Sequence, residues 1–144
     1  MLCFVDSNVV VYWFQKFEST DDLQTRKQTI AGNLIHRLAT EDRIVISTQV
    51  IGETFNAITR KGKRPLSKDE AADAIDLLLE FPVIPTDITL ARSAVTRSRQ
   101  SHLSYYDALI VEAAIRSGAS ILYTEDLHHG TRYGSIELCN PFLP

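Results

Sequence analysis

Four acidic residues stand at positions where a metal-dependent hydrolase would use them. They are Asp6, Glu53, Asp107 and Asp126. Carboxylates gathered in one place repel one another and raise each other's pKa, unless a divalent cation neutralises them. Carboxylate oxygens suit Mg²⁺ or Mn²⁺, and a water bound to such an ion is a nucleophile for phosphodiester attack. These residue types therefore predict metal-assisted hydrolysis, provided that the fold brings the four together.

Each of these acids also has an ordinary structural interpretation. Asp6 can cap a helix that follows it, and Asp107 can belong to a capping box opened by Ser104. Glu53 can be a solvated residue beside an apolar helix face, and Asp126 can belong to a turn. For no single acid does the sequence distinguish a structural role from a catalytic one. The placement of all four acids in the fold therefore decides between the two roles.

Short apolar runs alternate with amphipathic stretches along the chain, which is typical of strands separated by helices. Strands are predicted at residues 2–5, 44–46, 81–85, 121–124 and 136–138. Helix signals lie at 8–14, near Thr20 and Asp21, at Thr48, at the capping box of Ser67 and Glu70, at Thr86, and over 105–116 before Gly118. This alternation predicts a single domain over 1–144, a three-layer α/β/α sandwich with a mostly parallel central sheet.

The predicted topology gathers the four acids at one edge of the sheet. Asp6 follows the first strand and Asp126 the fourth, while Glu53 lies one turn into the helix after the second strand. Asp107 opens the apolar helix over 105–116. Sheets of this kind place their sites beyond the carboxyl ends of the strands. All four acids are therefore expected within reach of one site.

Composition and charge exclude several classes of protein. The 144 residues hold 15 basic and 18 acidic side chains, a formal net charge of −3, and only two cysteines. No apolar run approaches the ~20 residues of a membrane span, and no secretory signal is recognisable, so we expect a cytoplasmic protein with no membrane partner. A negative net charge, taken alone, disfavours a nucleic-acid partner. Without the four candidate acids, however, 14 acidic residues face 15 basic ones.

Four segments resemble motifs of the PIN-domain family, and more narrowly of VapC-type toxins. The first runs from Phe4 to Tyr12 and holds a D-x-N motif at Asp6 and Asn8. The others are 46–53 with Glu53, 103–110 with Asp107, and 124–127 with the later 140–142. The four stand in the family's order and in register with the strand–helix pattern, and together they cover nearly the whole chain.

The resemblance implies a ribonuclease that hydrolyses RNA with a metal-activated water and leaves 5′-phosphate and 3′-hydroxyl ends. It makes Asp6, Asp107 and Asp126 the metal ligands, Asp126 directly or through water, with Glu53 holding the metal or orienting the water. Asn8, Ser104 and Thr124 would hydrogen-bond these carboxylates or the scissile phosphate. It also implies a homodimer and a cognate protein antitoxin.

Two basic groups are candidates for RNA contacts, since an RNA enzyme needs phosphate partners around an acidic pocket. They are Arg60, Lys61, Lys63 and Arg64 in one group, and Arg97 and Arg99 in the other. Solvated surface is the alternative for both. The pair His128 and His129 is predicted to lie in a turn and not to bind a metal, because imidazole does not suit the expected Mg²⁺ or Mn²⁺.

Two rival functions remain open at this point. The first is a PIN-like scaffold that binds RNA or protein without turnover. The second is a haloacid-dehalogenase-type phosphatase, in which a strand also ends in Asp. Those enzymes need a second Asp two residues later, where this chain has Asn8. Asn8 therefore disfavours the phosphatase, and the presence of all four acids disfavours the scaffold.

Overall fold

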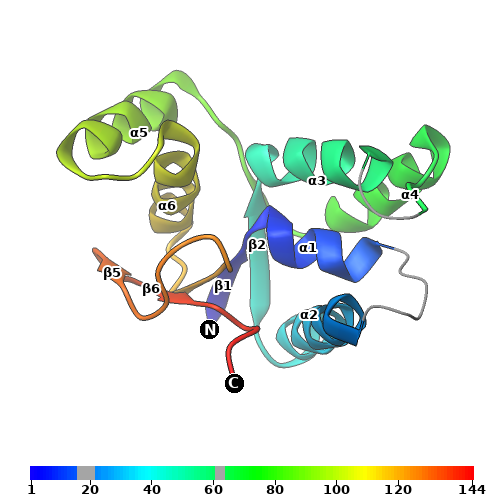
Figure 1. Ribbon diagram of the computed structural model, residues 1–144. Helices are drawn as coiled ribbons and strands as arrows, with labels where there is room; N and C mark the ends of the chain where they lie inside the picture. Colours follow the sequence, from blue (N-terminus) through cyan, green and yellow to red (C-terminus); the bar gives the residue numbers. More distant parts are fainter. Residues whose placement is uncertain (16–21, 61–63) are drawn as a thin grey trace.

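The computed structural model describes residues 1–15, 22–60 and 64–144. Within them, a six-stranded sheet lies between helices (Figure 1). The strands are β1 (Leu2–Val5), β2 (Arg43–Ser47), β3 (Val83–Ile84), β4 (Ile121–Tyr123), β5 (Arg132–Tyr133) and β6 (Ile136–Cys139). The helices are α1 (Ser7–Phe14), α2 (Asp22–Glu41), α3 (Thr48–Arg60), α4 (Lys68–Leu78), α5 (Ile88–Gln100) and α6 (Tyr105–Ser117).

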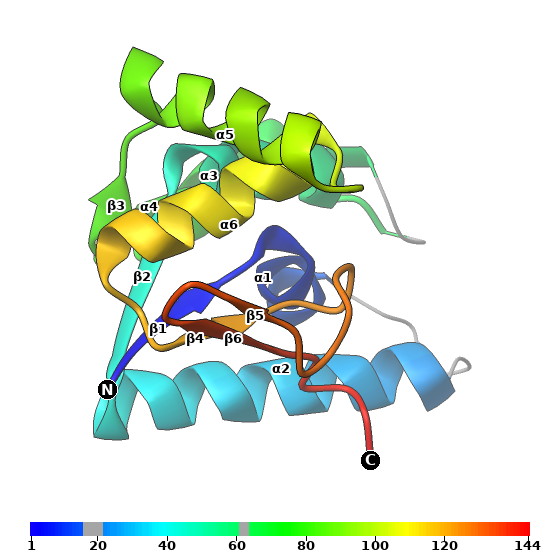
Figure 2. The same ribbon diagram turned by 90° about the vertical axis from the view of Figure 1, so that its left-hand side faces the viewer.

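The sheet has the strand order β3-β2-β1-β4-β6-β5 and is parallel except for the last pair. Helix α2 covers one face, and α6, backed by α5, covers the other (Figure 2). The predicted three-layer α/β/α fold with a mostly parallel sheet is therefore confirmed. Among the described residues, none of the helices is long and apolar enough to span a bilayer.

The register of the two central strands decides where the site lies. Val5 of β1 pairs with Tyr123 of β4. The next residue, Asp6, donates its backbone N–H to the Tyr123 carbonyl at 3.0 Å. Because the strands are parallel, Asp6 and Thr124 leave the sheet side by side at its carboxyl edge. The predicted edge is thus formed by two neighbouring strands.

Helix ends follow local chemistry, although α1 begins at Ser7, one residue before the predicted start, and α5 begins later than predicted. Ser67 and Glu70 form the predicted capping box of α4, and Gly118 ends α6 with a φ of 79°. Helix α5 was expected to start at Thr86, but Asp87 caps it and accepts from the Leu90 N–H at 2.8 Å. A carboxylate is the stronger acceptor at the positive end of a helix, which explains the later start.

Two regions of the predicted pattern differ from the structure or lie outside it. The predicted start of α2 at Thr20 and Asp21 lies outside the described residues. Strand β5 was not predicted: it pairs antiparallel with β6 through Tyr133 and Ile136, on either side of a turn at Gly134 with a φ of 59°. Two residues are too short a run to show the alternation by which a strand is recognised.

Candidate active site at the carboxyl edge of the sheet

Asp6 is at once a helix cap and the most buried of the candidate acids. Its side chain is 5% exposed. One carboxylate oxygen accepts from the Ser7 N–H at 2.7 Å and the other from the Thr124 hydroxyl at 2.8 Å. The capping role and the proposed site role are therefore compatible, because the cap fixes the orientation of the carboxylate.

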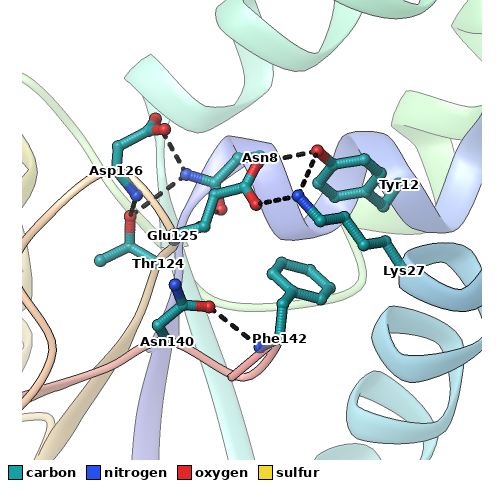
Figure 3. A network of polar contacts seen from close by, with 8 residues as sticks. All are labelled: Asn8, Tyr12, Lys27, Thr124, Glu125, Asp126, Asn140 and Phe142. Carbon is teal, nitrogen blue, oxygen red and sulfur yellow. Dashed lines mark hydrogen bonds and ion pairs between the residues drawn. The ribbon is translucent and has the colours of Figure 1, made fainter. Parts of the chain in front are cut away.

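Asn8 connects two of the acids across the sheet edge. Its Nδ2 lies 3.0 Å from Asp126 Oδ2, 3.1 Å from Thr124 Oγ1 and 3.4 Å from Asp6 Oδ2. Its Oδ1 accepts from the Glu125 N–H at 3.3 Å. Figure 3 shows Asn8 between α1 and the turn that carries Thr124 and Asp126. An amide supplies both donors and an acceptor here, which an aspartate at this position would not.

Glu53 lies on α3, the helix that follows β2, and is hydrogen-bonded to the same group of side chains. Ser7 Oγ donates to Glu53 Oε1 at 3.1 Å, and Gln49 Nε2 lies 3.4 Å from Glu53 Oε2. The same Gln49 nitrogen donates to the Tyr106 carbonyl at 3.1 Å. Gln49 therefore links α3 to the start of α6, where Asp107 lies.

The burial of Asp6 makes its ionised form costly. Burial is the largest cause that raises the pKa of Asp6, to about 7. Hydrogen bonds from Thr124 and Ser7 oppose this rise, and the charges of Glu53 and Asp126 add to it. A cation at this edge would offset both the burial and the repulsion.

Asp107 stands apart from the other three acids. Its backbone N–H donates to Ser104 Oγ at 3.2 Å, so Ser104 acts as the helix cap. Asp107 and Asp126 line a common pocket of about 620 Å³. Among the described residues, no three acidic, histidine or cysteine side chains converge closely enough to hold a metal. The acids instead meet in pairs: Asp6 with Asp126 through Asn8, and Asp107 with Asp126 at the pocket.

A second group of side chains, which was not predicted from the sequence, holds the turn that carries Thr124 and Asp126. It contacts this turn through Glu125. Lys27 Nζ of α2 donates to Glu125 Oε2 at 2.9 Å, and the Tyr12 hydroxyl donates to Glu125 Oε1 at 2.9 Å. The Tyr12 and Phe142 rings pack edge to face at 5.1 Å, with Lys27 Nζ above both (Figure 3). No local sequence pattern predicts these contacts, because Lys27 and Glu125 are 98 residues apart in the chain.

The candidate RNA-contacting residues have different surroundings. Arg60 and Arg99 are exposed, whereas Lys61 and Lys63 lie outside the described residues and Arg64 follows them. Arg97 donates to Glu112 and lies against the Tyr133 ring, 5.4 Å from its centroid. Its guanidinium therefore already has partners within the chain.

The two histidines of the 128–129 pair have separate surroundings. His129 Nδ1 accepts from the Asn140 N–H at 3.0 Å, so it supports the turn as expected. His128 lines the pocket beside Asp126. The pair therefore does not act as one unit.

Comparison with known proteins decides the family. The family model of the PIN domain matches residues 3–130. This chain belongs to the PIN domain family. The family predicted from the four motifs is thereby confirmed.

Three solved structures share this PIN fold. Mycobacterium tuberculosis VapC20, described as a sarcin-ricin loop cleaving toxin, is 18% identical with a TM-score of 0.61, over 83% of this chain and 86% of that one. A chain of VapBC2 from Rickettsia felis, bound to a DNA fragment from its promoter, is 20% identical with a TM-score of 0.64, over 96% and 97%. A chain of VapBC-1 from nontypeable Haemophilus influenzae is 17% identical with a TM-score of 0.59, over 88% and 87%. At these identities the likeness shows the fold. No curated protein sequence matches the chain significantly.

Proposed function

We propose that this PIN domain is an endoribonuclease that hydrolyses phosphodiesters of unpaired RNA with Mg²⁺ or Mn²⁺. The observation that carries the proposal is the linked set at the sheet edge, in which Asn8 connects Asp6, Thr124 and Asp126. Membership in the PIN family, whose members are nucleases, supports it. The family assignment also favours a nuclease over the phosphatase alternative.

The candidate ligand atoms are of the type that a hard divalent cation prefers. Every candidate ligand is an oxygen donor. Burial, and to a smaller extent the charges of Glu53 and Asp126, raise the pKa of Asp6 to about 7. Asp6, Asp107 and Asp126 would hold the ion partly through bound waters, because the three carboxylates do not converge closely among the described residues. Such an ion supplies a bound water of lowered pKa and neutralises charge on the phosphate.

The chain's own residues supply orientation and a proton acceptor. Thr124 and the Ser7 N–H fix the Asp6 carboxylate, and Asn8 holds Asp126 relative to it. Glu53, held by Ser7 and Gln49, orients the attacking water and accepts a hydrogen bond from it. Thr124 is fully buried, so it acts on the carboxylates and not on the phosphate.

Cleavage of unpaired RNA in the presence of Mg²⁺ or Mn²⁺ tests the proposal. We expect Asp6→Asn and Asp107→Asn each to lower the rate at least about a hundredfold, because changes to groups that merely support metal ligands already cost 10- to 100-fold. The exposed acid Asp73 provides the matched control, and Asp73→Asn should leave the rate unchanged.

Three outcomes would contradict this function. Undiminished cleavage in excess chelator would remove the metal from the mechanism. Tight RNA binding without cleavage of any RNA would favour the scaffold alternative. Hydrolysis of small phosphomonoesters instead of RNA would favour a phosphatase.

We further propose that the nuclease is the toxin of a cytoplasmic toxin–antitoxin module, acting as a homodimer. The support is the fold shared with VapC20 and with chains of two VapBC structures. A cognate antitoxin with a basic side chain that reaches Asp6 and Asp126 would compete with the metal. Expression should arrest growth, and co-expression of a small adjacent reading frame should relieve the arrest. A monomeric mass by light scattering would contradict the homodimer.

A further inference from the structure

A pocket lies beside the paired carboxylates and is not explained by metal binding. Asp107 and Asp126 form one wall. The remaining described lining comes from the α5–α6 connection, the turn after β4, and β5: His102, Leu103, Leu127, His128, Thr131 and Tyr133. Its volume, about 620 Å³, falls in the range of sites that bury a small organic ligand.

Away from the two carboxylates, the chemistry of this lining favours an uncharged ring over a phosphate. None of the described lining residues is lysine or arginine, and without a bound cation the two carboxylates repel an anion. Leu103 and Leu127 offer apolar contacts, and Tyr133 offers an aromatic ring. The two imidazoles and the Thr131 hydroxyl offer hydrogen bonds to groups at the edge of a heterocycle. An unpaired nucleobase combines these features: a flat ring with donors and acceptors on its rim.

We propose that this pocket binds one unpaired base of the RNA, next to the phosphate that is cleaved at Asp107 and Asp126. This inference rests on the proposed nuclease function and names the part of the substrate that the site recognises. The two acids shared by the pocket and the metal site fix the base within one nucleotide of the reacting phosphate. Phosphate contacts would then position the RNA while this pocket reads a base.

Tyr133 is built to serve as the stacking surface. Its ring lies against the Arg97 guanidinium, which is itself paired with Glu112 of α6. Its backbone is held in β5 through pairing with Ile136 of β6. An aromatic ring that packs against one guanidinium and whose backbone is held in a strand loses little freedom when a base stacks on it, so less binding energy is lost in ordering it.

Binding is measured with single-stranded RNA hexamers that carry one 2-aminopurine, whose fluorescence is quenched when the base stacks. The Asp6→Asn background prevents the proposed cleavage, and Asp6 is not a lining residue. Tyr133→Leu should abolish the quenching and raise Kd about tenfold, the effect of one lost stacked base. Tyr133→Phe should retain both. His36 is exposed on α2, and His36→Ala is the matched control for His128→Ala, which should weaken binding.

Cleavage then tests the position of the base. In the otherwise unchanged protein, an abasic nucleotide beside the mapped cleavage site should lower kcat/KM about tenfold, chiefly through KM. The Tyr133→Leu protein should show no such penalty, because the partner of that base is already gone. Melting temperatures of all variants report whether each variant stays folded as a whole.

The two proposals fail in different ways. If no RNA is cleaved, the proposed function is overturned, while quenching still decides whether the pocket takes a base. If RNA is cleaved but the abasic penalty is equal in both proteins, or Tyr133→Leu leaves Kd and quenching unchanged, the pocket is not a base site. A peptide segment would then be the better candidate for its occupant.

Discussion

The turn over residues 124–127 has two sides that are built in opposite ways. On one side Glu125 is held by Lys27 and Tyr12, with the Phe142 ring beneath them (Figure 3). On the other side Asp126 faces a pocket that none of the described residues fills. Neighbouring residues of one short segment therefore point into a closed cluster and an open site.

This difference shows that the fold holds one side of the turn rigid and leaves the other side accessible. The Lys27 and Glu125 side chains are only 22% and 20% exposed, so their ion pair is shielded from water more than a surface pair would be. Since Glu125 also donates its N–H to Asn8, the closed side fixes the residue that joins Asp6 to Asp126. The open side leaves the carboxylates accessible. Preorganised groups beside an accessible pocket are what a hydrolytic site requires.

The largest expected effect comes from the buried acid Asp6, which Asn8 joins to Asp126. Because its pKa is raised from 3.8 to about 7, protonated Asp6 favours the folded state. This contribution is fully present below about pH 4 and is lost as the pH rises through 7. The shift corresponds to a loss on the order of 4 kcal/mol. In chelator, the free energy of unfolding of the unchanged protein should therefore fall between pH 4 and 8 relative to Asp6→Asn.

Urea unfolding at several pH values measures this difference. Asp73→Asn, an exposed acid on α4, is the control and should keep the pH dependence of the unchanged protein. Added Mg²⁺ should restore stability at pH 8 in the unchanged protein but not in Asp6→Asn. Parallel curves for all three proteins in chelator would contradict the account of Asp6.

A smaller effect is expected from breaking the closed side at Lys27. Lys27→Met keeps most of the aliphatic stem but leaves Glu125 without its cation, which should cost about 2 kcal/mol of stability. RNA cleavage should fall as well, because Glu125 and Asn8 then hold Asp126 less firmly. Thermal unfolding and cleavage rates report the two effects separately.

Conservative and reversed variants separate the charge from the packing. Lys27→Arg should recover most of the cleavage rate, and Lys27→Glu combined with Glu125→Lys should recover more than either change alone. If Lys27→Met lowered stability and left cleavage unchanged, the cluster would be a brace of the fold with no influence on the site.

Residues that obey local rules were predictable from the sequence. Asp6 and Asp126 follow apolar runs, and the parallel sheet brings strand ends to one edge. The capping box at Ser67 and the stop at Gly118 are equally local signals. Asp6 shows that capping a helix is compatible with a place in the candidate site, which no spacing rule could have decided.

Features made by distant residues were not predictable. The partner of Lys27 lies on a turn 98 residues away, and Tyr133 belongs to a two-residue strand defined only by its pairing with β6. That no three of the described acids converge closely enough to hold a metal is likewise a property of how the helices pack. Charge and polarity indicate that such residues can form hydrogen bonds or ion pairs. Their partners are determined only by the three-dimensional arrangement.

The smallest expected effect lies far from both sides of the turn and sharpens the comparison between them. Ser67 caps α4, which packs with α1 and α3 in a small separate cluster. Ser67→Ala removes the acceptor for the Glu70 N–H and should cost about 1 kcal/mol of stability. Cleavage and RNA affinity should stay unchanged below the melting transition, because this helix contributes none of the candidate site residues.

Ser67→Ala therefore serves as the stability reference for Lys27→Met. Both variants weaken the fold by a similar order, but only Lys27 contacts the turn that carries Asp126. At a temperature well below both transitions, a lower cleavage rate in Lys27→Met alone would assign the loss to the position of the carboxylates. Equal losses in the two variants would mean that the rate follows global stability, and the closed side would then have no separate role in positioning the site.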